Sequence, residues 1–202
     1  MSHEAVSDLG GRRMGDGAVV RPYASSMETS TESSTLLEGI VRDATRALFG
    51  GYGAPLELDA SPAHETLERA SFVAVIGFSS STFNGSLLMA LPNDVVARTL
   101  PAAGGDLMDW CGELANQLLG RLKNQLVEYR VSINMTLPVV ISGGRFALPA
   151  KTRPVTRYFT FASAFGNLLV RLEAELSPDV ELVRQVRIEG GRALEEGELL
   201  LF

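Results

Sequence analysis

Residues 109–126 constrain the fold more than any other stretch of this chain. At about 100° per residue, the apolar side chains of the stretch fall on one broad arc of a helix, as they do in helices that pack against a core. The sequence therefore predicts a long amphipathic helix with one buried face. The buried arc comprises Trp110, Cys111, Leu114, Ala115, Leu118, Leu119, Leu122 and Leu126.

The opposite arc of the same helix carries an unusual set of side chains. Asp109, Glu113, Asn116 and Gly120 follow one another at spacings of four, three and four residues, which places them on one helix face. A face that meets only water favours Lys and Glu, whereas here a short amide follows a carboxylate by one turn. Gly120 destabilises the helix by about 1 kcal/mol relative to alanine, and its lack of a side chain lets another molecule approach the backbone. We interpret these four residues, the polar stripe, as a surface that meets another molecule closely.

The polar stripe and a later proline resemble the signature of a known family. The pattern Asp-x-x-x-Glu-x-x-Asn followed at a fixed distance by Pro is typical of the CheC/CheX/FliY phosphatases, which remove the phosphoryl group from the chemotaxis response regulator CheY. The similarity extends from about residue 35 to residue 176 and looks most like CheX. The matching residues are Asp109, Gly112, Glu113, Asn116, Leu137 and Pro138, with 21 residues between Asn116 and Pro138, about one fewer than in the family pattern.

This resemblance implies a fold and a set of residue roles. The fold is expected to be α/β of the α+β type, with long central helices packed on a largely antiparallel sheet. The implied catalytic residues are Glu113, which contacts the lysine of the receiver, and Asn116, which orients the attacking water. Asp109 and Gly120 are expected to touch the partner, although the helix dipole explains a first-turn carboxylate such as Asp109 equally well. Pro138 is expected to shape the strand beneath the site.

An amide suits the chemistry that the resemblance implies. Hydrolysis of an aspartyl phosphate needs a water placed in line with phosphorus, and the phosphorylated CheY-type receiver itself supplies Mg²⁺ and a lysine to neutralise the phosphoryl oxygens. The amide of Asn116 offers both a donor and an acceptor, so it can direct a water without taking its proton. We therefore expect no cofactor and no metal of the chain's own.

Two other interpretations remain open at this point. In the first, the polar stripe is a non-catalytic docking module for a receiver or a motor component. The altered Pro138 spacing and the extra residues 177–202 are compatible with this alternative. In the second, the stripe merely faces water in a structural domain. Saturable binding without a change in the rate of receiver dephosphorylation would indicate the docking module.

Composition excludes several other classes of function. The net charge of -6 provides no basic surface for nucleic acid. Cys111 is the single cysteine, so no internal disulfide is possible, and neither Cys111 nor His64 belongs to a cluster with zinc spacing. No apolar stretch approaches the roughly 20 residues that span a bilayer. We expect a cytoplasmic protein that does not bind membranes, and the resemblance makes a homodimer plausible.

The rest of the chain is expected to supply one domain with two tails. Residues 1–34 lack periodicity and are expected to be disordered, residues 35–176 to form the CheX-like domain, and residues 177–202 to form an extension that packs on the domain or on a partner. Thr35 and Glu38 have the form of a capping box that begins a first helix, which ends near Gly50. Because Glu38 is followed by Val41 and not by Asn three residues later, no second site is expected there.

Strand patterns account for most of the remaining domain. Residues 56–58 are a short strand candidate, and a loop containing His64 follows. Residues 72–78 and 85–91 are expected to pair as a hairpin over an Asn84-Gly85 turn. A short helix follows Pro92. Residues 133–139 alternate as one half-buried strand, and residues 155–162 and 168–176 form a second hairpin over Gly166. The Gly143-Gly144-Arg145 and Gly190-Gly191-Arg192 segments are expected to be turns, and residues 180–188 a further strand.

Overall fold

The computed structural model describes residues 23–147 and 155–177, and its centre is a seven-stranded antiparallel sheet. The strand order is β1-β6-β7-β3-β2-β4, and β5 pairs with β2 beside β4. The expectation of a largely antiparallel sheet in an α+β fold is thereby confirmed. The strands are β1 (Glu57–Leu58), β2 (Phe72–Ser79), β3 (Phe83–Leu91), β4 (Asn134–Met135), β5 (Val139–Ser142), β6 (Val155–Ser163) and β7 (Gly166–Leu176).

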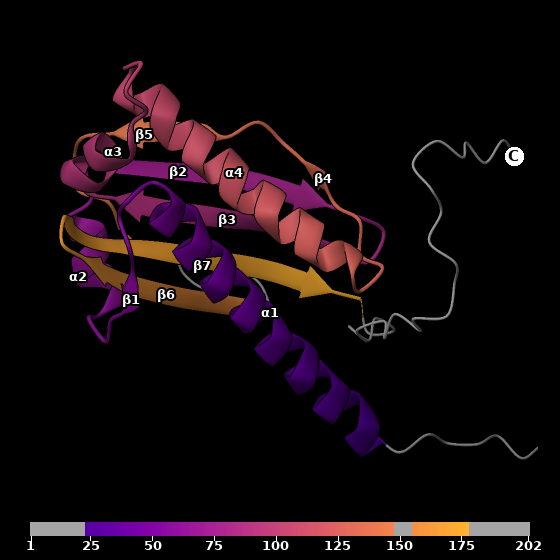
Figure 1. The fold of residues 1–202 in the computed structure, drawn as a ribbon. Helices are drawn as coiled ribbons and strands as arrows, with labels where there is room; N and C mark the ends of the chain where they lie inside the picture. The colour runs from indigo at the N-terminus through magenta and orange to yellow at the C-terminus, as the bar shows by residue number, and fades with distance from the viewer. Residues whose placement is uncertain (1–22, 148–154, 178–202) are drawn as a thin grey trace, which may run out of the picture.

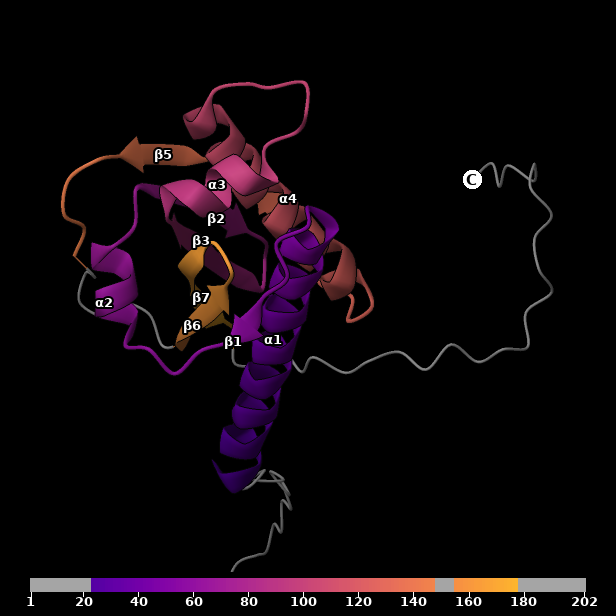
Figure 2. The same ribbon diagram turned by 60° about the vertical axis from the view of Figure 1, so that its left-hand side comes forward.

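Helices lie on both faces of this sheet. The two long helices, α1 (Tyr23–Gly51) and α4 (Leu107–Val127), cover one face, while α2 (Ala63–Glu68) lies against the other (Figures 1 and 2). The short helix α3 (Asn93–Thr99) follows β3 and packs near the start of α4. Because α1 and α4 both bury an apolar face against the same side of the sheet, their other faces point to solvent.

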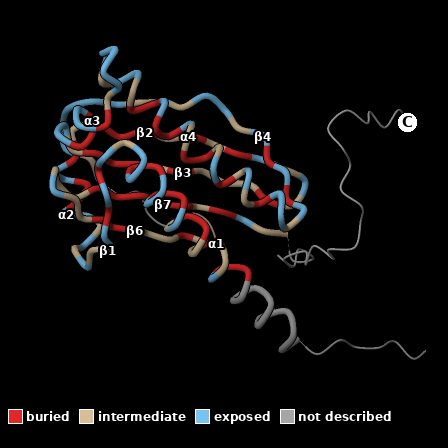
Figure 3. The backbone as a smooth tube through the Cα atoms, viewed as in Figure 1, coloured by how far each residue is buried: buried red, intermediate tan, exposed pale blue. Residues whose placement is uncertain are grey.

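The apolar arc predicted for α4 is buried as expected. Cys111, Leu114, Ala115, Leu118 and Leu119 are fully buried in the main core. Burial alternates along α4 between the side that meets the sheet and the side that faces away (Figure 3). The helix begins where the Asp106 side chain accepts hydrogen bonds from the backbone N–H groups of Met108 and Asp109, which is a capping arrangement. The core and this cap together fix which residues of α4 point outward.

The start of α1 differs from the sequence prediction. The helix begins at Tyr23, so the expected start at Thr35 is wrong, and residues 23–34 are not a disordered tail. Near the expected start, Arg157 on β6 donates from Nη2 to Ser34 Oγ at 2.8 Å and from Nε to the carboxylate of Glu38. Glu38 is therefore engaged by an arginine instead of closing a capping box at Thr35.

The first hairpin is confirmed, but its turn is displaced. β2 and β3 pair from Phe72 opposite Leu91 to Phe78 opposite Gly85, so Gly85 lies within the strand. The turn comes earlier, where Ser80 Oγ accepts from the backbone N–H of Phe83 at 2.8 Å. The second hairpin also turns earlier than predicted, because Gly166 already pairs with Ser163 as the first residue of β7.

The strand predicted for residues 133–139 is in fact two short strands. β4 and β5 both pair with β2, and Thr136 keeps contact with β2 through a bond from its backbone N–H to the Gly77 carbonyl at 2.9 Å. The ladder is then interrupted at Leu137 and Pro138, where proline has no N–H to donate. The prediction of one buried face was wrong here, because Leu137 is 87% exposed and Val139 63% exposed.

Smaller expectations had mixed outcomes. β1 and α3 are present as predicted, and Gly143 and Gly144 form a turn with positive φ at both residues. The segment containing His64, predicted as a loop, is instead α2, whose Leu67 is buried. Residues 1–22, the strand predicted at 180–188, the Gly190-Gly191-Arg192 turn and nearly all of the 177–202 extension lie outside the described residues. Apart from the boundary at residue 34, which lies inside α1, the division into a domain and two tails stays a prediction.

Candidate functional site

The structure places the polar stripe on the outward face of α4. Asp109, Glu113 and Asn116 are exposed, and Gly120 is half-buried. All four lie on the side of α4 that faces away from the sheet, because the residues between them form the buried arc. A partner can therefore approach the stripe without any rearrangement of the core.

One flank of the polar stripe is formed by the chain where β4 passes into β5. A Cβ added to Gly112 would lie 3.2 Å from Val140 Cγ2 and 3.5 Å from Pro138 Cγ. The helix therefore approaches β5 closely immediately before Glu113. Pro138 lies close to α4 beside the stripe, and the structural role expected for it stays a prediction.

The other flank is formed by the end of α1, and it holds two residues that the sequence did not single out. Tyr52 follows α1 and donates its hydroxyl to Gln117 Oε1 at 2.9 Å. Gln117 in turn donates from Nε2 to Glu113 Oε1 at 2.9 Å. The sequence could have indicated Gln117, because it follows Glu113 by four residues and therefore lies on the same helix face. No sequence pattern links Tyr52 to Glu113, because Tyr52 lies in another part of the chain.

Asn116 differs from Glu113 in its surroundings. Within the described residues no hydrogen bond to its side chain is present, so both its carbonyl oxygen and its NH₂ group point to solvent as an available acceptor and donor. Glu113 is oriented by the protein and Asn116 is open to water. The pair therefore combines one fixed carboxylate with one amide able to bind water, although the catalytic roles themselves stay predictions.

Asp109 lies in the first turn of α4, one turn before Glu113. Its backbone N–H is capped by Asp106, so Asp109 is not the capping residue. Its carboxylate remains near the positive end of the helix dipole and on the exposed face. Contact with a partner and stabilisation of the helix both remain compatible with this position.

Cys111 has no place in the site. Its side chain is fully buried, and burial raises the pKa of its thiol to about 12. A thiol with such a pKa stays protonated near neutral pH, and only the thiolate is a strong nucleophile. The interpretation of Cys111 as a small core residue is confirmed.

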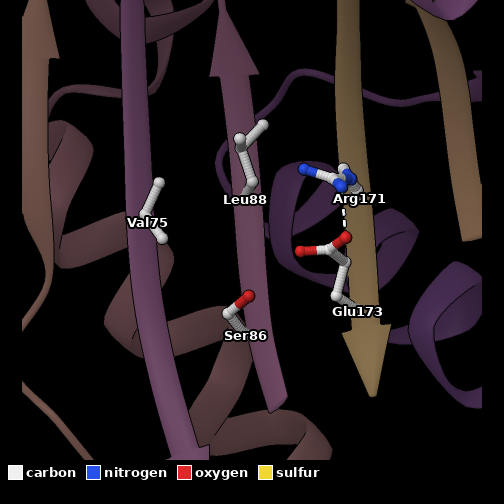
Figure 4. A pocket seen from close by; sticks show the side chains of 5 residues that line it. All are labelled: Val75, Ser86, Leu88, Arg171 and Glu173. Carbon is white, nitrogen blue, oxygen red and sulfur yellow. Dashed lines mark hydrogen bonds and ion pairs between the residues drawn. The ribbon is translucent and has the colours of Figure 1, made fainter. Parts of the chain in front are cut away.

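A separate hollow of about 200 Å³ lies on the opposite face of the sheet (Figure 4). Arg171 is buried there, pairs with the carboxylate of Glu173 and stacks over the ring of Tyr158 at 5.6 Å. Because neighbouring strand residues alternate between faces, this hollow is separated from α4 by the thickness of the sheet. It is lined by Val75, Ser86, Leu88, Arg171 and Glu173.

The described residues also give information on metal binding and on membrane spans. No group of three or more His, Cys, Asp or Glu side chains is placed to hold a metal ion within residues 23–147 and 155–177. Over the same described part of the chain, no helix combines the length and the apolar character that a membrane span requires.

Comparison with known families shows what the central part of the chain is similar to. Residues 72–160, which include β2, β3, α4 and the start of β6, match the family model described as chemotaxis phosphatase CheX. The domain is CheX-like. The match contains the whole polar stripe and Pro138, the residues on which the resemblance was first based. A comparison with curated protein sequences gives no match.

Solved structures share the fold of the CheX-like domain. The chemotaxis protein CheX from Vibrio vulnificus has a TM-score of 0.59 at 19% identity, covering 69% of this chain and 96% of that one. The CheX from Desulfovibrio desulfuricans gives 0.56 at 19% identity, covering 69% and 99%. The CheX of a CheX–CheY–BeF₃–Mg²⁺ complex from Borrelia burgdorferi gives 0.51 at 13% identity, covering 68% and 96%. At these identities the similarity establishes the fold alone.

Gly120 of the CheX-like domain permits a simple stability test. A Cβ added there meets no atom within 4 Å. We expect Gly120→Ala to raise the free energy of unfolding by about 0.5–1 kcal/mol, because alanine loses less backbone entropy in a helix. Urea unfolding followed by circular dichroism would measure the change. A destabilised variant would contradict the placement of Gly120 in an open position of the helix.

Proposed function

We propose that the CheX-like domain is a protein phosphatase that hydrolyses the aspartyl phosphate of a CheY-type response regulator in chemotaxis or related two-component signalling. The observation that carries the proposal is the exposure of Glu113 and Asn116 on one face of α4, within the segment that matches the CheX family. Both side chains project from a helix whose opposite face is fixed in the core. A rigid ridge of this kind suits insertion into the active site of a receiver.

Asn116 acts on the nucleophile in this mechanism. Its amide holds a water in line with phosphorus, the water oxygen forms the new P–O bond, and the bond between phosphorus and the receiver aspartate breaks. The products are inorganic phosphate and the free carboxylate. The transition state gains little covalent help from the phosphatase, since positioning and charge neutralisation provide most of the rate. The open hydrogen-bonding groups of Asn116 support this role.

Glu113 sets the docking register. Its carboxylate accepts a charge-assisted hydrogen bond from the lysine ammonium of the receiver, while Mg²⁺ belongs to the phosphorylated receiver and neutralises phosphoryl oxygens there. The proposal assigns no metal to this chain. The one-turn separation of Glu113 and Asn116 allows both to reach a single site on the partner.

The surface beside the stripe supports a protein partner. Met108 at the start of α4 is exposed, and Leu137 is exposed beside Pro138. Apolar side chains, with methionine among the enriched types, are typical of the core of protein interfaces. The Borrelia burgdorferi complex joins a protein of this fold to CheY, and we extend that partner class to this chain. Asp109 and Gly120 complete the contact surface in the proposal.

A homodimer in the cytoplasm completes the proposed assembly. β5 carries Val139, 63% exposed, and Ile141, 51% exposed, next to β2. A short apolar strand of this kind offers a surface on which a second copy can pair. The dimer would place one polar stripe on each protomer, so each copy would retain its own site.

Phosphate release from a phosphorylated receiver tests the function directly. We expect the full chain to shorten the lifetime of the phosphorylated receiver by at least about tenfold at saturating concentration, because a positioned water replaces a random encounter. The measurement is the loss of labelled phosphoryl group with time, with the receiver alone as control. Saturable binding with an unchanged lifetime would overturn the phosphatase and establish the docking module instead.

A further inference from the structure

The hydrogen bonds that reach Glu113 form a continuous relay from the end of α1. The Tyr52 hydroxyl donates to Gln117 Oε1, and Gln117 Nε2 donates to Glu113 Oε1, each at 2.9 Å. We propose that Gln117, held by Tyr52, is a positioning residue that orients Glu113 for contact with the lysine of the receiver. This inference rests on the proposed function and adds two residues that the family signature does not contain.

The direction of the relay is fixed by its two ends. A carboxylate only accepts hydrogen bonds, so the group that meets Glu113 must be the NH₂ of the Gln117 amide. The carbonyl oxygen of the same amide then faces Tyr52, whose hydroxyl must donate to it. Both hydrogen bonds therefore form in only one orientation of the Gln117 amide, and a flip of that amide would break both.

The anchor of the relay is rigid because it belongs to the packed part of the domain. The ring of Tyr52 meets the ring of Trp110 edge-on, with centroids 5.2 Å apart and planes at 88°. Trp110 in turn donates from Nε1 to Thr99 Oγ1 at 3.1 Å. Such aromatic contacts have a preferred geometry and resist displacement. The end of α1, the end of α3 and α4 are thus linked beneath the exposed carboxylate.

The relay leaves one oxygen of Glu113 for the partner. Oε1 already accepts from Gln117, so the other carboxylate oxygen, Oε2, is held outward. A glutamate alone on a helix surface samples several rotamers, and ordering it on binding costs free energy. With the relay in place, part of that ordering is complete before the receiver arrives. Preordering of Glu113 therefore affects the affinity for the receiver, whereas Asn116 acts on the chemical step.

Two variants remove the relay with little change in packing. Tyr52→Phe deletes only the hydroxyl and keeps the ring against Trp110, and Gln117→Leu replaces the amide by an apolar side chain that is one bond shorter. We expect each to raise the KM for the phosphorylated receiver about threefold to tenfold while kcat changes less than twofold, because the net contribution of one ordinary hydrogen bond is of that size. Tyr129→Phe and Gln125→Leu make the same chemical changes away from Glu113 and should leave KM unchanged.

A double-mutant cycle separates positioning from a structural role. In a Glu113→Ala background, Tyr52→Phe should have no further effect on KM, because the carboxylate that it orients is gone. An equal rise in KM in both backgrounds would overturn the inference, as would an unchanged KM in an active Tyr52→Phe single variant. The relay's failure would leave the phosphatase proposal standing.

A measurement that does not depend on activity shows whether the relay exists even if the proposed function fails. NMR relaxation of the Gln117 side-chain NH₂ should report restricted motion in the parent chain and faster motion in Tyr52→Phe. If the parent chain leaves the phosphorylated receiver's lifetime unchanged while this difference is present, the relay exists and the proposed function has failed. Equal motion of the Gln117 amide in both proteins would overturn the relay itself.

Discussion

Asn116→Ala is expected to reduce the rate constant for dephosphorylation of the bound receiver on the order of a hundredfold or more, which corresponds to about 2.7 kcal/mol of lost transition-state stabilisation. The amide of Asn116 is the one group of the polar stripe that is exposed and still has its donor and acceptor available to a water. Its removal leaves the in-line water without direction. Single-turnover loss of phosphoryl group from a labelled receiver at saturating phosphatase measures the effect.

The same substitution should leave the fold unchanged. Asn116 is exposed and contributes nothing to the core, so the free energy of unfolding should change by less than about 0.5 kcal/mol. Asn124→Ala is a matched control, since Asn124 is an exposed asparagine on the same helix two turns later. An Asn116→Ala protein as fast as the parent, or an Asn124→Ala protein equally slow, would exclude the assigned role.

Gly85→Ala is expected to lower the free energy of unfolding by about 3 kcal/mol or more. A Cβ at Gly85 would lie 2.1 Å from the carbonyl oxygen of Glu173 and 2.6 Å from Phe78 Cζ. Overpacking of a core by one methyl group typically costs about 1–3 kcal/mol, and the clash here is with backbone, which cannot rotate away. The strands β2, β3 and β7 would have to separate locally.

Urea unfolding of Gly85→Ala beside Gly120→Ala gives an internal comparison. The chemical change is the same, yet the two effects should have opposite signs, since Gly120 has open space and Gly85 has none. A Gly85→Ala protein as stable as the parent would show that the three strands are less closely packed than the structure describes.

Local patterns in the sequence predicted the elements that depend on local chemistry. The 3.6-residue period of α4 identified both its buried arc and its exposed stripe, and alternation identified the paired runs of β2 with β3 and of β6 with β7. These predictions held because the apolar faces of these elements are the faces that pack.

The failures have a shared cause, which is tertiary contact. Asn84-Gly85 has the composition of a turn, yet Gly85 is required inside a strand by the approach of β7. The capping box expected at Thr35 lies inside α1, which begins at Tyr23, and Arg157 on a distant strand binds Ser34 and Glu38 there. The contact of Tyr52 with Gln117 could not be predicted for the same reason, since 65 residues separate the two along the chain.

The two-sided character of α4 has a consequence for how such proteins diverge. Its inward face holds the domain together and its outward face carries the polar stripe, so under the proposed function a substitution in the stripe would remove most catalysis and still yield an intact scaffold. Selection can then retain that scaffold as an adaptor that only recognises its receiver. In the proposed mechanism, the loss of one amide would convert the enzyme into a protein that mainly binds.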